Sequence, residues 1–113
     1  MSRKEEFNLR FEKYIRQTGT EVYYCDTSAL GQSRTFALIL SGYDRFYTED
    51  LIEEIENAQA WDYYVDYHHP DSLTDHFAVI IVPPNVLISS HNYQIPLQVW
   101  KELMQEWLAF LNI

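Results

Sequence analysis

A chain of 113 residues with 47% hydrophobic residues is long enough to bury one core, so a single domain over residues 1–113 is expected. Its 17 acidic and 8 basic residues give a formal net charge of -9, which argues against nucleic acid as the partner because a duplex would repel the chain. One cysteine rules out an intrachain disulfide, and three glycines leave little scope for a glycine-rich phosphate loop.

The N-terminal residues predict an amphipathic helix that ends at Gly19. Ser2 is a suitable N-cap, and a glycine commonly follows the last turn of a helix. This segment shows no apolar stretch typical of a secretory signal, so we expect a cytoplasmic protein. The apolar stripe of the predicted helix consists of Phe7, Phe11, Tyr14 and Ile15.

Two strands are predicted next, Thr20–Asp26 and Arg34–Leu40, with a loop at Thr27–Ser33. The first is rich in β-branched and aromatic residues. The second contains a continuous apolar run that does not alternate, which indicates a strand covered on both faces.

An acidic helix is predicted to begin at Thr48, which would act as its N-cap with Glu49 and Asp50 in the first turn. Like charges recur along its exposed side at a spacing of four residues, which costs helix stability. The predicted buried stripe consists of Leu51, Ile52, Ile55 and Ala58.

The remaining strands are predicted at Trp61–Tyr67, Phe77–Val82 and Val86–Ser89. The first alternates cleanly, and Pro70 with Asp71 marks a turn after it. The second is continuously apolar and is expected to be the central strand. The uncharged stretch His76–Trp100 is interrupted by three prolines, so we do not expect it to cross a membrane.

A final helix is predicted to begin with Pro96 at its first position and to extend to Leu111. Its wide apolar face, which includes Trp100 and Trp107, either closes the core or forms a homodimer contact through Leu97–Leu111. The order α-β-β-α-β-β-(β)-α predicts an α+β fold: a sandwich with an antiparallel or mixed sheet of about four to five strands packed by three helices.

The charge is concentrated in Tyr43–Asp75, which holds ten carboxylates and one cation, whereas the rest of the chain holds seven of each. Carboxylates mixed with aromatic residues are typical of a surface that binds a basic protein. The alternative is an acidic surface that only aids solubility. The predicted partner-binding residues are Tyr47, Glu49, Glu53, Glu56, Asp62, Tyr64, Asp66 and Tyr67, with Trp61 as a further anchor.

No catalytic motif is present, and no cofactor is expected. The nearest to a metal site is the loop with His68, His69, Asp71 and His76, whose residue types suit zinc but whose spacing matches no metal motif. Cys25 is expected to be packed and unreactive, because the adjacent Asp26 raises a thiol pKa.

Three functions are therefore considered. The first is an inhibitor or immunity-type antidote that covers the basic site of a partner, such as a nuclease toxin. The second is a small homodimeric chaperone or adaptor. The third is a metal-dependent enzyme that uses the histidine loop. We expect the first, and we expect that the protein is not an enzyme.

Overall fold

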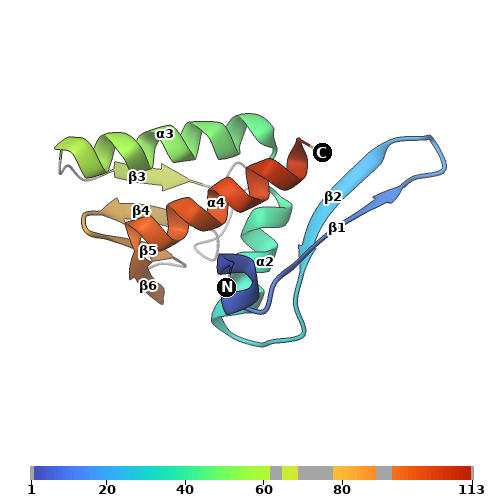
Figure 1. Cartoon of the computed structure of the whole chain (residues 1–113), viewed down its shortest axis with the longest axis horizontal. Helices are drawn as coiled ribbons and strands as arrows, with labels where there is room; N and C mark the ends of the chain where they lie inside the picture. Colours follow the sequence, from blue (N-terminus) through green and yellow to red (C-terminus); the bar gives the residue numbers. More distant parts are fainter. Residues whose placement is uncertain (1, 62–64, 69–77, 89–92, 113) are drawn as a thin grey trace.

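A four-stranded antiparallel sheet and a two-stranded antiparallel ribbon are joined by helices in the computed structural model, which describes residues 2–61, 65–68, 78–88 and 93–112 (Figure 1). The α+β fold class is thereby confirmed. Within the described residues the elements are α1 Arg3–Glu6, β1 Arg10–Ile15, β2 Glu21–Asp26, α2 Gln32–Ser41, α3 Arg45–Trp61, β3 Val65–His68, β4 Ala78–Val82, β5 Asn85–Ile88, β6 Tyr93–Pro96 and α4 Leu97–Leu111.

The main sheet has the strand order β3-β4-β5-β6, with every neighbouring pair antiparallel. β4 is an inner strand, as predicted for Phe77–Val82, and the short strand predicted at Val86–Ser89 corresponds to β5. β6 was not predicted, because four residues are too few for their alternation to be distinctive. Alternate residues form a buried apolar face: Val79, Ile81, Val86, Ile88 and Ile95.

The predicted N-terminal helix is wrong beyond its first turn. Ser2 does cap α1 by accepting the Glu5 N–H at 3.3 Å, but Asn8 has a φ of 59° and ends the helix. The chain then forms β1, which pairs with β2 in the register Phe11↔Cys25. Phe7 and Phe11 still pack against the core, so their spacing of four residues reflected burial and not a continuous helix.

The ribbon formed by β1 and β2 extends away from the rest of the molecule (Figure 1). Gly19, with a φ of 88°, lies in the turn that joins the two strands and not at a helix end. Tyr14 and Ile15, predicted to be buried, are 48% and 66% exposed near this turn. The ribbon therefore offers exposed apolar side chains at its tip.

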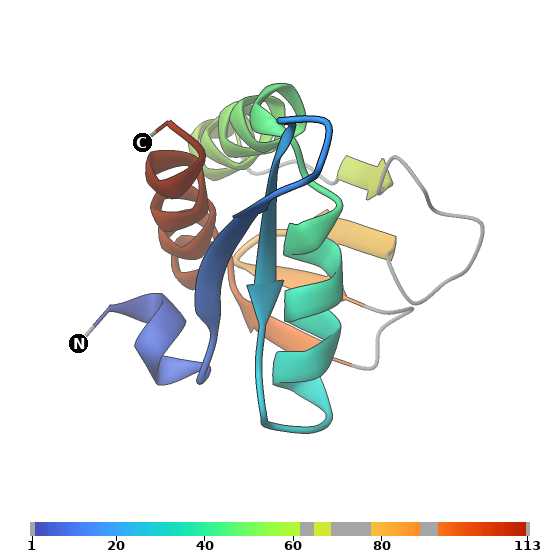
Figure 2. The same ribbon diagram turned by 90° about the vertical axis from the view of Figure 1, so that its right-hand side faces the viewer.

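The strand predicted at Arg34–Leu40 is also wrong, because these residues lie in helix α2. Phe36, Ala37 and Leu40 share one helical face and are buried, whereas Leu38 is 53% exposed on the opposite side. An apolar run of five residues fits a buried strand and a buried helix equally well, so packing decides between them. Here α2 lies beside β2 (Figure 2).

Helix α3 begins at Arg45, three residues before the predicted Thr48 cap. Asp44 caps it by accepting the Tyr47 N–H at 2.8 Å, while Thr48 is fully buried and donates its hydroxyl to the Asp44 carbonyl at 2.7 Å. The predicted buried stripe is confirmed: Leu51, Ile52, Ile55 and Ala58. The helix continues to Trp61, so the strand predicted at Trp61–Tyr67 is shorter and corresponds to β3.

Helix α4 closes the core. Pro96 is its N-cap and the last residue of β6, not the first helical residue. The apolar stripe of α4 is used inside the chain, since Leu97, Trp100, Leu103, Met104 and Trp107 are buried. The apolar face on which the homodimer hypothesis rests is therefore already covered, although dimerisation through Leu97–Leu111 remains a prediction.

Aromatic rings connect α4 to the N-terminal half of the chain. Ring centroids lie 5.0 Å apart for Phe11 and Trp107, and 5.1 Å apart for Phe36 and Trp100. Tyr23 of β2 packs edge-on against Phe110 at 5.6 Å. These contacts place the base of the ribbon and α2 against α4.

The corner between α2 and α3 is held by a buried hydrogen bond. Trp107 Nε1 donates to the Tyr43 carbonyl at 3.0 Å. Trp100 is equally buried, but its Nε1 has no hydrogen-bond partner among the described residues. The two tryptophans of α4 therefore differ, because only the indole N–H of Trp107 adds a buried hydrogen bond to the stability of the described fold.

We predict that Trp107→Phe destabilises the protein more than Trp100→Phe does. Both changes shrink a buried ring, but only the first leaves the Tyr43 carbonyl without its donor, which costs about 1–3 kcal/mol more. Urea unfolding at 25 °C measures the difference in free energy. Equal losses for the two variants would show that the hydrogen bond does not hold the corner.

Candidate partner-binding surface

The outward side of α3 carries an aromatic residue near each end and carboxylates between them. Phe46, Asp50, Glu53 and Asn57 recur at spacings of four, three and four residues and form one stripe, and Trp61 lies one turn further along. Phe46 and Trp61 are 78% and 76% exposed. Their backbones lie about 22 Å apart at the helical rise of 1.5 Å per residue. We define the α3 surface by Phe46, Tyr47, Glu49, Asp50, Glu53, Glu56 and Trp61.

Helix α3, which carries the α3 surface, has few cations of its own. Lys101 Nζ lies 3.5 Å from Glu56 Oε2, and Arg45 is the only basic residue of the helix. Glu49 and Glu53 make no ion pair within the part of the chain that the structure describes, and both are exposed. Negative charge therefore accumulates along this helix.

Two carboxylates elsewhere in the described chain, Asp26 and Glu102, bind cations of neighbouring elements. Arg10 Nη2 donates to Asp26 Oδ2 at 2.8 Å across the base of the ribbon, and the Thr27 N–H followed by Arg10 holds the Asp26 pKa below its usual value. Glu102 has a lowered pKa because it accepts hydrogen bonds from Gln98 and Arg3. These carboxylates connect elements of the fold, whereas those of the α3 surface face solvent.

The structure brings together half of the predicted partner-binding residues. Tyr47, Glu49, Glu53 and Glu56 lie on α3, where Tyr47 is 39% exposed and the three glutamates are exposed. The backbone of Asp66 and Tyr67 lies in β3, but their side chains are not described. Asp62 and Tyr64 lie outside the described residues.

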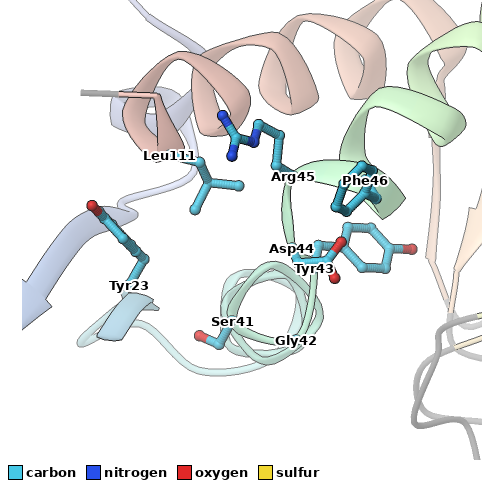
Figure 3. Close-up of a pocket in the computed structure, with 8 residues that line it drawn as sticks. All are labelled: Tyr23, Ser41, Gly42, Tyr43, Asp44, Arg45, Phe46 and Leu111. Atoms are coloured by element: carbon cyan, nitrogen blue, oxygen red, sulfur yellow. The ribbon is translucent and has the colours of Figure 1, made fainter. Parts of the chain in front are cut away.

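A hollow of about 410 Å³ lies between the ribbon, the corner that joins α2 to α3, and the end of α4 (Figure 3). Arg45 and Leu111 lie on one side of it and Ser41 on the opposite side, with Tyr23 and Asp44 on the flanks. Phe46 lies at its edge and also borders a second hollow of about 350 Å³ with Tyr47 and Asp50. We refer to the first of these as the corner hollow; it is lined by Tyr23, Ser41, Gly42, Tyr43, Asp44, Arg45, Phe46 and Leu111.

Sequence reasoning missed the corner hollow because its walls come from three distant parts of the chain. Phe46 belongs to the acidic stretch Tyr43–Asp75, but nothing in its spacing marks it as one of the most exposed rings. The available signal was the run Gly42, Tyr43, Asp44, in which a glycine and a helix-capping aspartate place a sharp corner beside aromatic residues.

The histidine loop, the nearest candidate for a metal site, lies mostly outside the described residues. His69, Asp71 and His76 are among the residues that are not described, and only the backbone of His68 is, at the end of β3. In the described part of the chain, no three His, Cys, Asp or Glu side chains gather as metal ligands would. The structure therefore does not test the metal-dependent alternative.

Cys25 has the environment of a packed thiol. It is 6% exposed and lies near the base of the ribbon, where it pairs with Phe11. Burial, followed by the neighbouring Asp26, raises its pKa to about 12. A nucleophilic cysteine needs the opposite shift.

We predict that Cys25 of the folded protein reacts with iodoacetamide at pH 8 at least about a hundredfold more slowly than in urea. The thiolate fraction at this pH is roughly a thousandfold below that of a free cysteine. Mass spectrometry of timed samples measures the rate. Rapid alkylation without urea would contradict the burial of this thiol.

We also predict that Glu53→Gln stabilises the protein, by about 0.5 kcal/mol, because it relieves repulsion from Glu49 and Glu56 at helical spacing. Thermal unfolding at low salt measures the change. Glu56→Gln is the matched control and should stabilise less, since it also removes the ion pair with Lys101. Loss of stability in Glu53→Gln would show that this carboxylate has a structural role.

Comparisons of the chain with protein-family models, with curated proteins and with solved structures find no match. Among the described helices, none combines the length and apolar character needed to cross a membrane.

Proposed function

We propose that the protein is an acidic binding module that uses the α3 surface to cover a basic site on a partner protein. An inhibitor or immunity-type antidote, for example of a nuclease toxin, has this role. The observation that supports it most directly is the pairing pattern of the carboxylates: Asp26 and Glu102 bind cations that connect elements of the fold, while Glu49 and Glu53 are exposed between two exposed aromatic rings.

Charge and aromatic groups would have separate tasks in such a surface. Uncompensated carboxylates attract a basic partner over roughly 10 Å at about 0.1 M salt and speed its association. Exposed Phe46 and Trp61 provide the apolar area that becomes buried and sets the dissociation rate. A surface that served only solubility would not need these two rings.

We also propose that the protein is not an enzyme and that it works in the cytoplasm. The buried Cys25 with its raised pKa supports a packed thiol over a nucleophile. The metal-dependent alternative depends on residues that the structure does not describe, so metal content of the purified protein is its direct test.

We predict that the double variant Glu49→Lys with Glu53→Lys loses partner binding by at least about a hundredfold, because two attractive contacts become repulsive. The measurement uses the wild-type chain as bait, with the proteins of the adjacent reading frames co-expressed, at low and high salt. At low salt the wild-type chain should capture a basic protein in an amount equal to its own. The captured protein should be released as the salt concentration rises.

The matched control is Glu5→Lys with Glu6→Lys, which changes the net charge equally but on α1. It should retain binding. Equal binding by the two double variants would show that the α3 surface is not the binding surface. The same conclusion would follow if the captured protein stays bound at high salt and also binds the α3 variant.

A further inference from the structure

The corner hollow is suited by its shape and position to hold part of a partner. About 410 Å³ lies within the range of ligand sites, and it is more than one aromatic side chain requires. The hollow opens beside Phe46, the first residue of the α3 surface stripe. A chain segment seated in it would therefore continue directly onto the carboxylates of α3.

The polar groups that line the corner hollow are engaged within the protein. The Tyr23 hydroxyl donates to Glu21 Oε2 at 2.6 Å, and Ser41 Oγ accepts the Cys25 N–H at 2.9 Å and lies 2.8 Å from the Ala37 carbonyl. Asp44 caps α3. Apart from Arg45, these walls have little hydrogen-bonding capacity left to recognise a polar small molecule, so an apolar group fits them better.

The remaining wall groups favour an aromatic occupant. Arg45 Nη1 donates to Asn112 Oδ1 at 3.2 Å, which fixes the guanidinium at the edge of the hollow beside Leu111 (Figure 3). A guanidinium binds the face of an aromatic ring, and the rings of Tyr23 and Phe46 can pack against its edge. Leu111 completes the apolar wall.

From these contacts, the geometry points to the corner hollow as an anchor pocket for an aromatic side chain of a basic segment in the partner protein. Charge complementarity identifies the segment: the aromatic residue sits in the hollow, and Lys or Arg residues next to it lie over Asp50, Glu49 and Glu53. This inference rests on the proposed function and adds which partner residue is recognised and where.

The test uses two short lysine-rich peptides that differ only at the centre, tryptophan in one and alanine in the other. Binding to the isotope-labelled full chain is followed by amide chemical shifts. The tryptophan peptide should bind at least about tenfold more tightly. It should shift the amides of Ser41–Phe46 and Leu111 as well as those of α3, whereas the alanine peptide should shift α3 alone.

Two variants locate the effect. Leu111→Trp fills the corner hollow and should abolish the advantage of the tryptophan peptide without changing the affinity for the alanine peptide. The matched control, Leu30→Trp, places the same ring at a residue that is 81% exposed before α2, and it should retain the advantage. Phe46→Ala, at a 78% exposed site that folding does not need, should reduce the advantage as well.

The outcomes separate the two proposals. Equal binding of both peptides, mapped to α3 and weakened by salt, would overturn the anchor pocket and leave the acidic binding surface in place. Absence of binding by either peptide at low salt would overturn both. An advantage for tryptophan that persists in Leu111→Trp would place the anchor elsewhere.

Discussion

The hydrogen bond from Trp107 Nε1 to the Tyr43 carbonyl is the interaction on which the arrangement of the surface depends. A carbonyl at a helix corner must find a donor when it is buried, and here the donor comes from α4. This contact fixes the end of α2 and the start of α3 relative to α4. The positions of Phe46, Arg45 and the corner hollow follow from it, since all lie within a few residues of Tyr43 or beside the end of α4.

The aromatic rings along α4 explain how a chain with a small main sheet stabilises an extended ribbon. Two-stranded ribbons are marginally stable alone, and this one is stabilised where Phe11 and Tyr23 pack against Trp107 and Phe110. Beyond these rings the ribbon leaves the core, and Ile15 becomes exposed. The core thus ends partway along the ribbon. The ring of Tyr23, at that boundary, serves both the core and the corner hollow.

The sequence identified the elements whose local signals agree with their packing. The buried stripe of α3 and the apolar face of α4 were predicted because each shows a period long enough to be distinctive. The inner strand β4 was predicted from a continuous apolar run that ends at Pro83 and Pro84. The N-terminal helix and the strand at Arg34–Leu40 were predicted wrongly for a common reason: Phe7 with Phe11, and the run from Phe36 to Leu40, are too short for their period to separate helix from strand. Long-range ring packing decided both.

The exposure of the α3 glutamates could be predicted from the sequence, because charges that are unpaired within their own helix remain at the surface in almost any fold. The corner hollow needed the tertiary structure, because Tyr23, Ser41 and Leu111 meet only after folding.

The polar groups that connect elements of the fold differ from the carboxylates of the α3 surface. Polar groups that join elements are satisfied inside the chain: Arg3 donates to Glu102, Arg10 donates to Asp26, and Ser41 accepts the Cys25 N–H. Repulsion among like charges at helical spacing lowers the stability of α3, and the fold tolerates this because the opposite face of the helix buries Leu51, Ile52, Ile55 and Ala58. A basic segment laid along α3 would relieve that repulsion on binding, so the same carboxylates that weaken the free helix would strengthen the complex. The repulsion that lowers the stability of the free protein would then increase its affinity for a basic partner. This repulsion lies on α3, the helix whose first turn borders the corner hollow.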